Sequence, residues 1–245
     1  MKKEYWIILI SYIAMQLSAY IGVPILLFIA GLMGFNPEAG TVIFNCGVIW
    51  LIFSFIVTLL ICLFLLRHEM KNPIRNNPTS IPASIGWAIG GIFLSLFAQS
   101  IAGYIEQLLG IDVASENTEQ ILSIIDAAPI AILVVSIAGP ILEELVFRKI
   151  LFGSLYKKFG FFLSALISSL IFALAHMDFI HTLMYASMGF TFAFLYVQTK
   201  RILVPIVAHV SMNTFVVIIQ LNYNKINKWL EENAGVTQFI GGLFK

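Results

Sequence analysis

Long apolar stretches separated by short polar loops dominate the pattern of hydrophobic and polar positions along this 245-residue chain. A helix needs about 20 mostly apolar residues to cross a bilayer, and six stretches meet this requirement. A further stretch, residues 128–155, is apolar as far as Leu142 and then contains several charges. The pattern therefore predicts about seven spanning helices, at residues 6–30, 42–66, 83–108, 128–155, 161–177, 179–198 and 202–221.

The segments between and after these spans add smaller elements. The uncharged run over residues 5–37 is too long for a secretory signal, so we interpret it as a retained helix. Asn117 with Gln120 three residues later resembles a helix start and predicts a short amphipathic segment in the loop before residue 128. We expect an all-α, polytopic transmembrane bundle, divided into about three spans in residues 1–110, a core in residues 111–224, and a tail or short eighth helix in residues 225–245.

Basic residues occur in alternate loops of this layout. One side collects the amino terminus, residues 67–82, Lys157–Lys158 and Lys200–Arg201, whereas the loops of the other side contain acidic residues and no lysine or arginine before Lys225. The positive-inside rule therefore predicts a cytoplasmic amino terminus in a multi-pass protein of the cell membrane. Omitting the span at 128–155 would place the later basic loops on the wrong side.

Composition supports a membrane protein and excludes other classes. The chain is 60% hydrophobic and 11% charged, whereas soluble domains contain about 25% charged residues. Its net charge of +1 provides no basic face for nucleic acid. Cys46 and Cys62 would lie about 24 Å apart on one helix, too far for a disulfide.

Ionisable residues occur where the layout predicts lipid. A charged side chain at mid-bilayer costs about 2.5–3.5 kcal/mol on insertion scales, so each such residue is a functional hypothesis. Three clusters stand out: Glu143, Glu144 and Arg148; Phe172 and His176; His209 and Asn213.

The clusters are expected at similar depths in the membrane. At 1.5 Å per residue, Glu143 lies about 20 Å from the cytoplasmic end of its helix, and His176 lies about 22 Å from the start of the next helix. His209 and Asn213 lie roughly 10–17 Å from the start of theirs. Polar groups from three helices therefore fall in one slab of the membrane and can converge.

Helical spacing suggests different roles for the two acids. Glu144 and Arg148 are four residues apart in the favourable order for an ion pair, whereas Glu143 is turned about 100° away. We therefore expect Arg148 to neutralise Glu144 and Glu143 to remain free to accept a proton. Each cluster alone is more often structural, and Phe172 is interpreted as a packing aromatic beside His176. Asp178 and His181 lie near a helix end, where polar residues near water are ordinary.

In order, the clusters resemble the EExxxR, FxxxH and HxxxN signatures of the CAAX protease and bacteriocin-processing family. These intramembrane proteases include the type II CAAX prenyl endopeptidases, and the resemblance covers roughly residues 115–221. The first 110 residues contribute only spans to this picture.

The resemblance implies an intramembrane endopeptidase that hydrolyses a membrane-associated peptide or protein. It assigns water activation to Glu143 and His176, oxyanion stabilisation to His209 and Asn213, and support of the helix to Glu144 and Arg148. Carboxylate, imidazole and amide groups suit these tasks chemically. No cofactor is required in this interpretation.

Alternatives remain open at this point. A catalytic zinc held by Glu143, His176 and His209 would leave one open ligand position, although the chain has no HExxH pair and Arg148 places a positive charge nearby. A proton-coupled transporter would also bury Glu and His, but it predicts internal symmetry, whereas the buried charge here lies in the second half of the chain. A membrane scaffold that retains the motifs is the third alternative.

Overall fold

The computed structural model describes residues 2–71, 77–112 and 116–232, which fold into helices, with no strand among them. The first four helices are α1 (Lys3–Leu17), α2 (Ala19–Leu32), α3 (Gly40–Lys71) and α4 (Ile81–Leu108). The short α5 (Glu116–Ala127) precedes a continuous helical run made of α6 (Ala131–Leu133), η1 (Val134–Ala138), α7 (Gly139–Glu143), η2 (Glu144–Phe152) and α8 (Gly153–Ala175). The chain continues through α9 (Thr182–Thr199), α10 (Leu203–Leu221) and α11 (Tyr223–Glu232).

The first predicted span, residues 6–30, is two helices rather than one. α1 and α2 meet at Ser18 with a bend of 52°. The Ser18 hydroxyl donates to the Met15 carbonyl oxygen at 2.7 Å and accepts from the Trp50 indole N–H at 2.9 Å. Serines that bond back to their own helix can accompany bends, and apolar periodicity did not reveal this break.

The bundle is an all-α membrane fold, but fewer helices qualify individually as spans than the seven expected. Four stretches of the described chain are long and apolar enough, Gly40–Glu69, Ile81–Leu108, Ala131–Ala175 and Leu203–Leu221, and the bent pair α1 and α2 makes a fifth. Two expected spans, 128–155 and 161–177, fall within the single run Ala131–Ala175. α9 is helical over most of 179–198 but is not among the stretches that qualify.

Gly160 divides the long helical run. Its φ of 71° and ψ of −171° lie in a region open mainly to glycine, so the chain turns between η2 and the greater part of α8. The turn folds α8 back so that it packs against η2. The predicted boundary between the fourth and fifth spans is therefore a glycine turn inside one continuous run.

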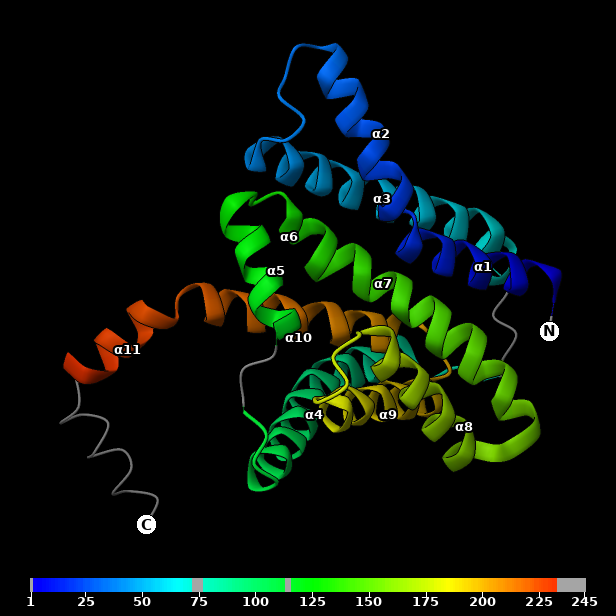
Figure 1. Cartoon of the computed structure of the whole chain (residues 1–245). Helices are drawn as coiled ribbons and strands as arrows, with labels where there is room; N and C mark the ends of the chain where they lie inside the picture. The colour runs from blue at the N-terminus through cyan, green and yellow to red at the C-terminus, as the bar shows by residue number, and fades with distance from the viewer. Residues whose placement is uncertain (1, 72–76, 113–115, 233–245) are drawn as a thin grey trace.

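The helices form two groups on either side of the run from α6 to η2. In Figure 1, α1, α2 and α3 lie above this run, and α4, α8 and α9 lie below it. α4 packs against α9 and α10, and α8 packs against α9. α10 contacts η1 and α7, which places it next to the charged part of the run.

Close helix packing below the run depends on small residues. A Cβ atom on Gly189 of α9 would lie 2.8 Å from the Ser169 Cβ of α8, and one on Gly91 of α4 would lie 2.6 Å from a Leu195 methyl group. Small residues at such contacts let helix backbones approach each other in membranes. α9 therefore lies tightly between α8 and α4.

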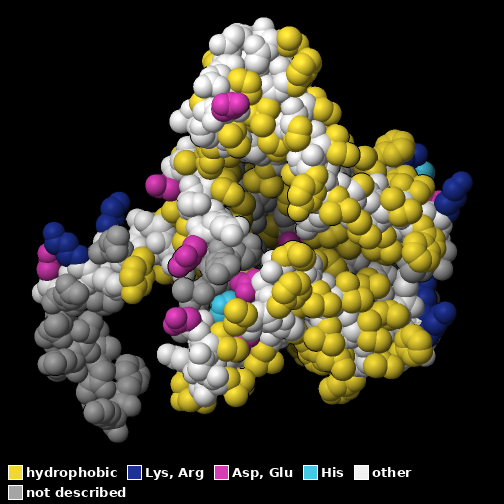
Figure 2. Space-filling model, in the orientation of Figure 1, with side chains coloured by type: hydrophobic (Ala, Val, Ile, Leu, Met, Phe, Trp, Pro, Cys, Tyr) yellow, Lys and Arg dark blue, Asp and Glu magenta, His cyan; other side chains and the backbone are white. Residues whose placement is uncertain are grey.

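The outer surface is predominantly apolar, as a lipid-facing surface requires. Figure 2 shows hydrophobic side chains over most of the visible face, Lys and Arg toward its left and right edges, and several acidic side chains near a hollow at the centre. Large exposed residues such as Tyr20, Phe28 and Phe162 are between 69% and 82% accessible. Apolar surface of this extent suits a bilayer rather than water.

Two amphipathic helices accompany the bundle. α5 is the short segment expected before residue 128, although it begins at Glu116, ahead of the expected cap at Asn117. α11 occupies residues 223–232, so part of the predicted tail is helical. Residues 233–245 of that tail lie outside the described part of the chain, and the division at residues 110 and 224 stays a prediction.

Candidate active site

The two acidic residues lie where the helical run changes its winding. Glu143 ends α7, and Glu144 begins η2, a π-helical segment of nine residues. Such wide turns are rare and often occur at functional sites. The change in winding falls between the two acids, so their side chains need not diverge as they would in a regular α-helix.

Glu144 and Arg148 form the expected ion pair. Arg148 Nη1 lies 3.1 Å from Glu144 Oε1, and both side chains are buried, with 1% and 0% exposure. The guanidinium carbon of Arg148 also lies 4.1 Å from the ring centroid of Phe172 and 5.3 Å from that of Phe192. The arginine is thus held by one carboxylate and two aromatic faces, an arrangement that stabilises a buried cation.

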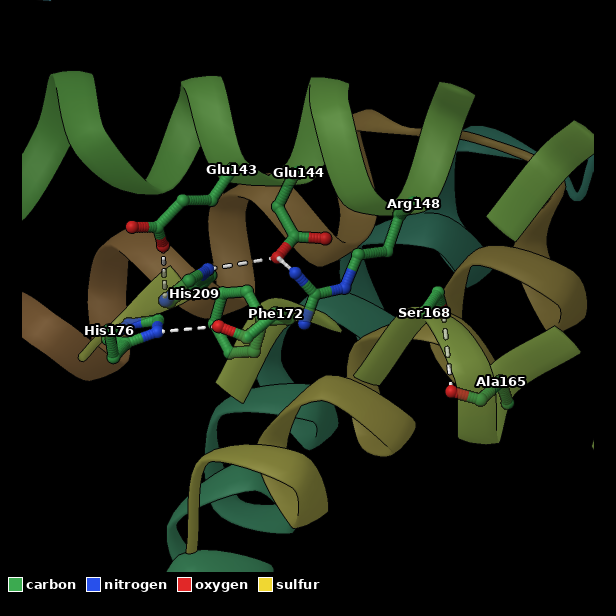
Figure 3. Close-up of polar contacts among 8 residues, drawn as sticks. All are labelled: Glu143, Glu144, Arg148, Ala165, Ser168, Phe172, His176 and His209. Atoms are coloured by element: carbon green, nitrogen blue, oxygen red, sulfur yellow. Dashed lines mark hydrogen bonds and ion pairs between the residues drawn. The ribbon is translucent and has the colours of Figure 1, made fainter. Parts of the chain in front are cut away.

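Both acids also reach the same histidine, which the predicted division of roles did not include. His209 Nδ1 lies 2.9 Å from Glu144 Oε1, and His209 Nε2 lies 3.7 Å from Glu143 Oε2. Figure 3 shows Glu143 and Glu144 reaching down from one helix to the two nitrogens of this ring. Adjacent positions of a regular helix point about 100° apart. Because the winding changes between these two residues and glutamate side chains are long, both carboxylates still reach the His209 ring.

His176 is positioned by its own helix. It follows the last residue of α8, and its Nδ1 lies 2.8 Å from the carbonyl oxygen of Phe172. A carbonyl oxygen only accepts, so Nδ1 carries the proton and Nε2 of the neutral ring keeps its lone pair. The Phe172 ring packs edge to face against His176 at 4.5 Å, as expected for a packing aromatic.

The four residues assigned to catalysis by resemblance line one cavity of about 470 Å³. Glu143, His176 and His209 are joined there by Asn213, which is half-buried and one helical turn beyond His209 on α10. Most of the lining side chains are apolar, as is usual for binding sites, and several polar ones, including Gln16, Gln99 and Gln220, accompany the four site residues. The predicted convergence of groups from three helices is therefore present.

The amino-terminal helices also contribute to this cavity, contrary to the expectation that they add only spans. Gln16 of α1, Leu51 and Phe55 of α3, and Gln99 of α4 line it, together with Ile121 and other residues of α5. Lining by these helices depends on how the bundle folds back on itself. Neither periodicity nor local motifs carry that information.

Two aromatic residues of α9 at the histidines were not singled out from the sequence. Tyr185 stacks on His176 with ring centroids 4.2 Å apart, and Phe192 stacks on His209 at 4.4 Å. The chain contains 21 phenylalanines and eight tyrosines, so no composition signal distinguishes this pair. Their separation of seven residues, two helical turns, is the only available signal.

His181 is buried, whereas the sequence suggested a polar residue near water. It is 5% exposed, and its Nδ1 lies 2.9 Å from Glu106 Oε2 of α4. The other oxygen, Glu106 Oε1, accepts a hydrogen bond from the main-chain N–H of Met184 at 3.0 Å. A partner 75 residues away could not be identified from a single sequence.

The residues that a zinc site would use line one cavity, and both histidines have hydrogen-bonding partners there. Nδ1 of His176 bonds a carbonyl oxygen, whereas His209 contacts Glu144 through Nδ1 and lies 3.7 Å from Glu143 Oε2 through Nε2. Among the described residues, no group of three or more His, Cys, Asp or Glu side chains has the arrangement of a metal site.

Comparisons with known proteins identify the family of the chain. Residues 126–215, which contain all three clusters, match the description "Type II CAAX prenyl endopeptidase Rce1-like". The chain is 51% identical over the whole of both chains to YdiL of Bacillus subtilis, which is named as a candidate membrane peptidase. It is 38% identical to the membrane-embedded CAAX protease MroQ of Staphylococcus aureus over 73% of this chain and 76% of that protein.

No solved structure matches the chain. The assignment of the chain to a family therefore rests on its sequence relatives, one of which is similar along the full length of the protein. A protease in the membrane also accounts for an apolar bundle with polar groups gathered at one internal cavity. The chain belongs to the Rce1-like family of type II CAAX prenyl endopeptidases and is a membrane protease.

Proposed function

We propose that the cavity hydrolyses a peptide bond with a water molecule activated by Glu143 and His176. The observation that carries this proposal is that both residues line one cavity with His209 and Asn213. The water oxygen attacks the carbonyl carbon of the scissile bond while its proton passes to the Glu143 carboxylate or to His176 Nε2. The same proton then moves to the departing amine as the carbon–nitrogen bond breaks, so the enzyme returns to its starting state.

His209 and Asn213 supply the oxyanion site in this proposal. The Asn213 amide donates hydrogen bonds without a change of charge. His209 donates through Nε2 only when the ring carries both protons, since its Nδ1 proton faces Glu144 at 2.9 Å.

Glu144 and Arg148 act through His209 rather than on the substrate. The carboxylate of Glu144 orients the imidazole and is itself held by Arg148 at 3.1 Å. Oriented donors stabilise developing charge most effectively in a site that excludes water. Glu144 is therefore proposed as a positioning residue of the oxyanion site, a role beyond support of the helix.

The reaction is proposed to proceed without a metal. Arg148 is 3.1 Å from Glu144, which contacts His209, so a fixed cation already lies beside the groups that a zinc ion would share. Asn213 is also better suited to donate hydrogen bonds than to bind zinc. The zinc-dependent alternative of the same protease uses Glu143, His176 and His209 as ligands.

The substrate is proposed to be a membrane-associated peptide or protein in the cell membrane. The cavity lies among helices suited to lipid, so a substrate must enter from the bilayer or its surface. The relative MroQ is named a membrane-embedded CAAX protease. This name favours a substrate whose chain end is anchored in the membrane. The basic loops support a cytoplasmic amino terminus and a multi-pass topology.

Kinetics of site variants test these roles. Purified full-length protein in nanodiscs is offered a pool of fluorogenic peptides, with and without lipid anchors, to select one reporter. His176→Ala and Asn213→Ala should both lower kcat, with the larger loss at His176, while the variants keep the wild-type melting profile. Wild-type kcat in folded His176→Ala would contradict the assignment of the base.

A further inference from the structure

One helix, α9, places an aromatic ring flat against each of the two histidines in the cavity. Tyr185 and His176 have centroids 4.2 Å apart and planes inclined by 24°, and Phe192 and His209 have centroids 4.4 Å apart and planes inclined by 22°. The two histidines come from the end of α8 and from α10, so they share no helix. The aromatic pair, seven residues apart, presents both rings from one helix face.

The stacks restrict a motion that the hydrogen bonds leave open. The His176 ring has one hydrogen bond, from Nδ1 to the Phe172 carbonyl oxygen. The His209 ring has Glu144 at Nδ1 and Glu143 3.7 Å from Nε2. Contacts at the edge of a ring do not prevent the ring from tilting out of plane, which would move Nε2 sideways. A parallel aromatic face opposes this tilt and leaves the Nε2 edge open.

The position of α9 along its own axis is also fixed, by a carboxylate from another helix. Glu106 of α4 is 2% exposed and contacts the His181 ring and the Met184 main-chain N–H at the start of α9. A carboxylate at this end of a helix satisfies a free N–H group and interacts favourably with the helix dipole. Met184 immediately precedes Tyr185, so Glu106 anchors the stacking residue nearest to this end.

We propose that α9 is the positioning element of the active site, with Tyr185 and Phe192 as positioning residues that hold the His176 and His209 rings in register. The inference rests on the proposed catalytic roles of the two histidines. It predicts that loss of either ring slows the chemical step without weakening substrate binding. Small misplacements of reacting groups, about 1 Å, can lower rates about a hundredfold.

Both aromatic residues also belong to the hydrophobic core, so packing alone must be distinguished from positioning. Methionine fills a similar volume without a flat ring and is tolerated in irregular cores. The test variants are therefore Tyr185→Met and Phe192→Met. Phe190→Met is the matched control, because Phe190 lies on the same helix and its ring packs against Phe161 and Phe162 rather than against a histidine.

Steady-state cleavage of the selected fluorogenic reporter by full-length protein in nanodiscs gives the primary measurement. We expect Tyr185→Met and Phe192→Met to lower kcat about 10- to 100-fold with little change in KM. Phe190→Met should keep wild-type kcat, and Tyr185→Phe should lose less kcat than Tyr185→Met because the ring is kept. Equal losses in all three Met variants, or a loss in Tyr185→Phe as large as in Tyr185→Met, would overturn the proposal.

Two further measurements keep the outcomes separate. Glu143→Gln serves as the reference. If Glu143→Gln retains activity, the proposed function fails whatever the α9 variants do. If Glu143→Gln is inactive but Tyr185→Met and Phe192→Met keep full kcat, only the positioning role is refuted. If a Met variant does not fold, proton NMR of histidine-labelled wild-type protein tests whether the aromatic rings stack on the two histidines. The ring protons of two of the four histidines, assigned as His176 and His209, should shift upfield from the stacked aromatics, and unshifted signals contradict the stacks.

Discussion

The Glu144 carboxylate faces His209 Nδ1 at 2.9 Å and Arg148 Nη1 at 3.1 Å through the same oxygen, Oε1. One buried atom therefore links the arginine of η2 to the imidazole of α10. The contact between His209 and Glu144 also decides which nitrogen of His209 faces the cavity, because Nδ1 is occupied. Glu144 is thus part of the candidate catalytic arrangement, although it does not reach the substrate in the proposed mechanism.

Removal of Glu144 should affect both folding and catalysis. Glu144→Ala leaves Arg148 buried without its carboxylate and is expected to destabilise the protein by about 3–5 kcal/mol. It also releases His209 Nδ1, so kcat should fall in whatever protein remains folded. Chemical denaturation in detergent and reporter cleavage at low temperature measure the two effects. Glu144→Gln keeps an acceptor for the His209 N–H and is the milder control. A Glu144→Ala protein as stable as wild type would contradict a stabilising role of the buried pair of Glu144 and Arg148.

The close contact of α8 and α9 gives a second prediction. Gly189→Ala places a Cβ 2.8 Å from the Ser169 Cβ and should cost about 1–3 kcal/mol of stability through overpacking. Because α9 carries Tyr185 and Phe192, the shift should also lower kcat. Thermal melts and reporter cleavage measure both quantities.

Gly90 of α4 provides the matched control for this substitution. Within the described part of the chain, and apart from its own helix backbone and adjacent residues, no atom lies within 4 Å of a Cβ built on Gly90. Gly90→Ala should therefore leave activity unchanged and raise stability by about 0.5–1 kcal/mol, the usual gain from replacing glycine inside a helix. An equal loss of activity in Gly189→Ala and Gly90→Ala would show that the close α8–α9 contact does not cause the loss in Gly189→Ala.

Removal of metal ions tests the choice between the two protease mechanisms. After treatment with phenanthroline and removal of bound metals, confirmed by elemental analysis, the wild-type protein should cleave the reporter at its original rate. The same treatment of a zinc protease of known dependence is the positive control. Loss of activity that returns on addition of zinc would contradict the metal-free mechanism and favour Glu143, His176 and His209 as ligands.

Helical spacing and depth predicted that Glu143, His176, His209 and Asn213 converge, and these four residues line one cavity. His176 and Glu143 lie 33 positions apart, yet counting 1.5 Å per residue along neighbouring helices placed them in one slab, and they line one cavity. The ion pair of Glu144 and Arg148 followed from spacing alone, since residues four apart share a helix face.

Contacts that depend on how helices are placed against one another could not be predicted. Glu106 and His181 lie 75 residues apart, and only folding reveals that the latter is buried rather than near water. Tyr185 and Phe192 are two among many aromatic residues, and their stacks depend on the axial position of α9. The bend between α1 and α2 at Ser18 interrupts an apolar run, and hydrophobic patterning does not record it.

The role of Glu143 is the central claim, and its substitution by glutamine tests it most directly. Glutamine keeps the size and hydrogen-bonding capacity of the side chain but cannot take a proton from water. With Glu143→Gln and wild type in nanodiscs at equal folded fraction, kcat for the selected reporter should fall by about 10²–10⁴ in the variant. A folded Glu143→Gln protein that cleaves the reporter at the wild-type rate would contradict the proposed mechanism.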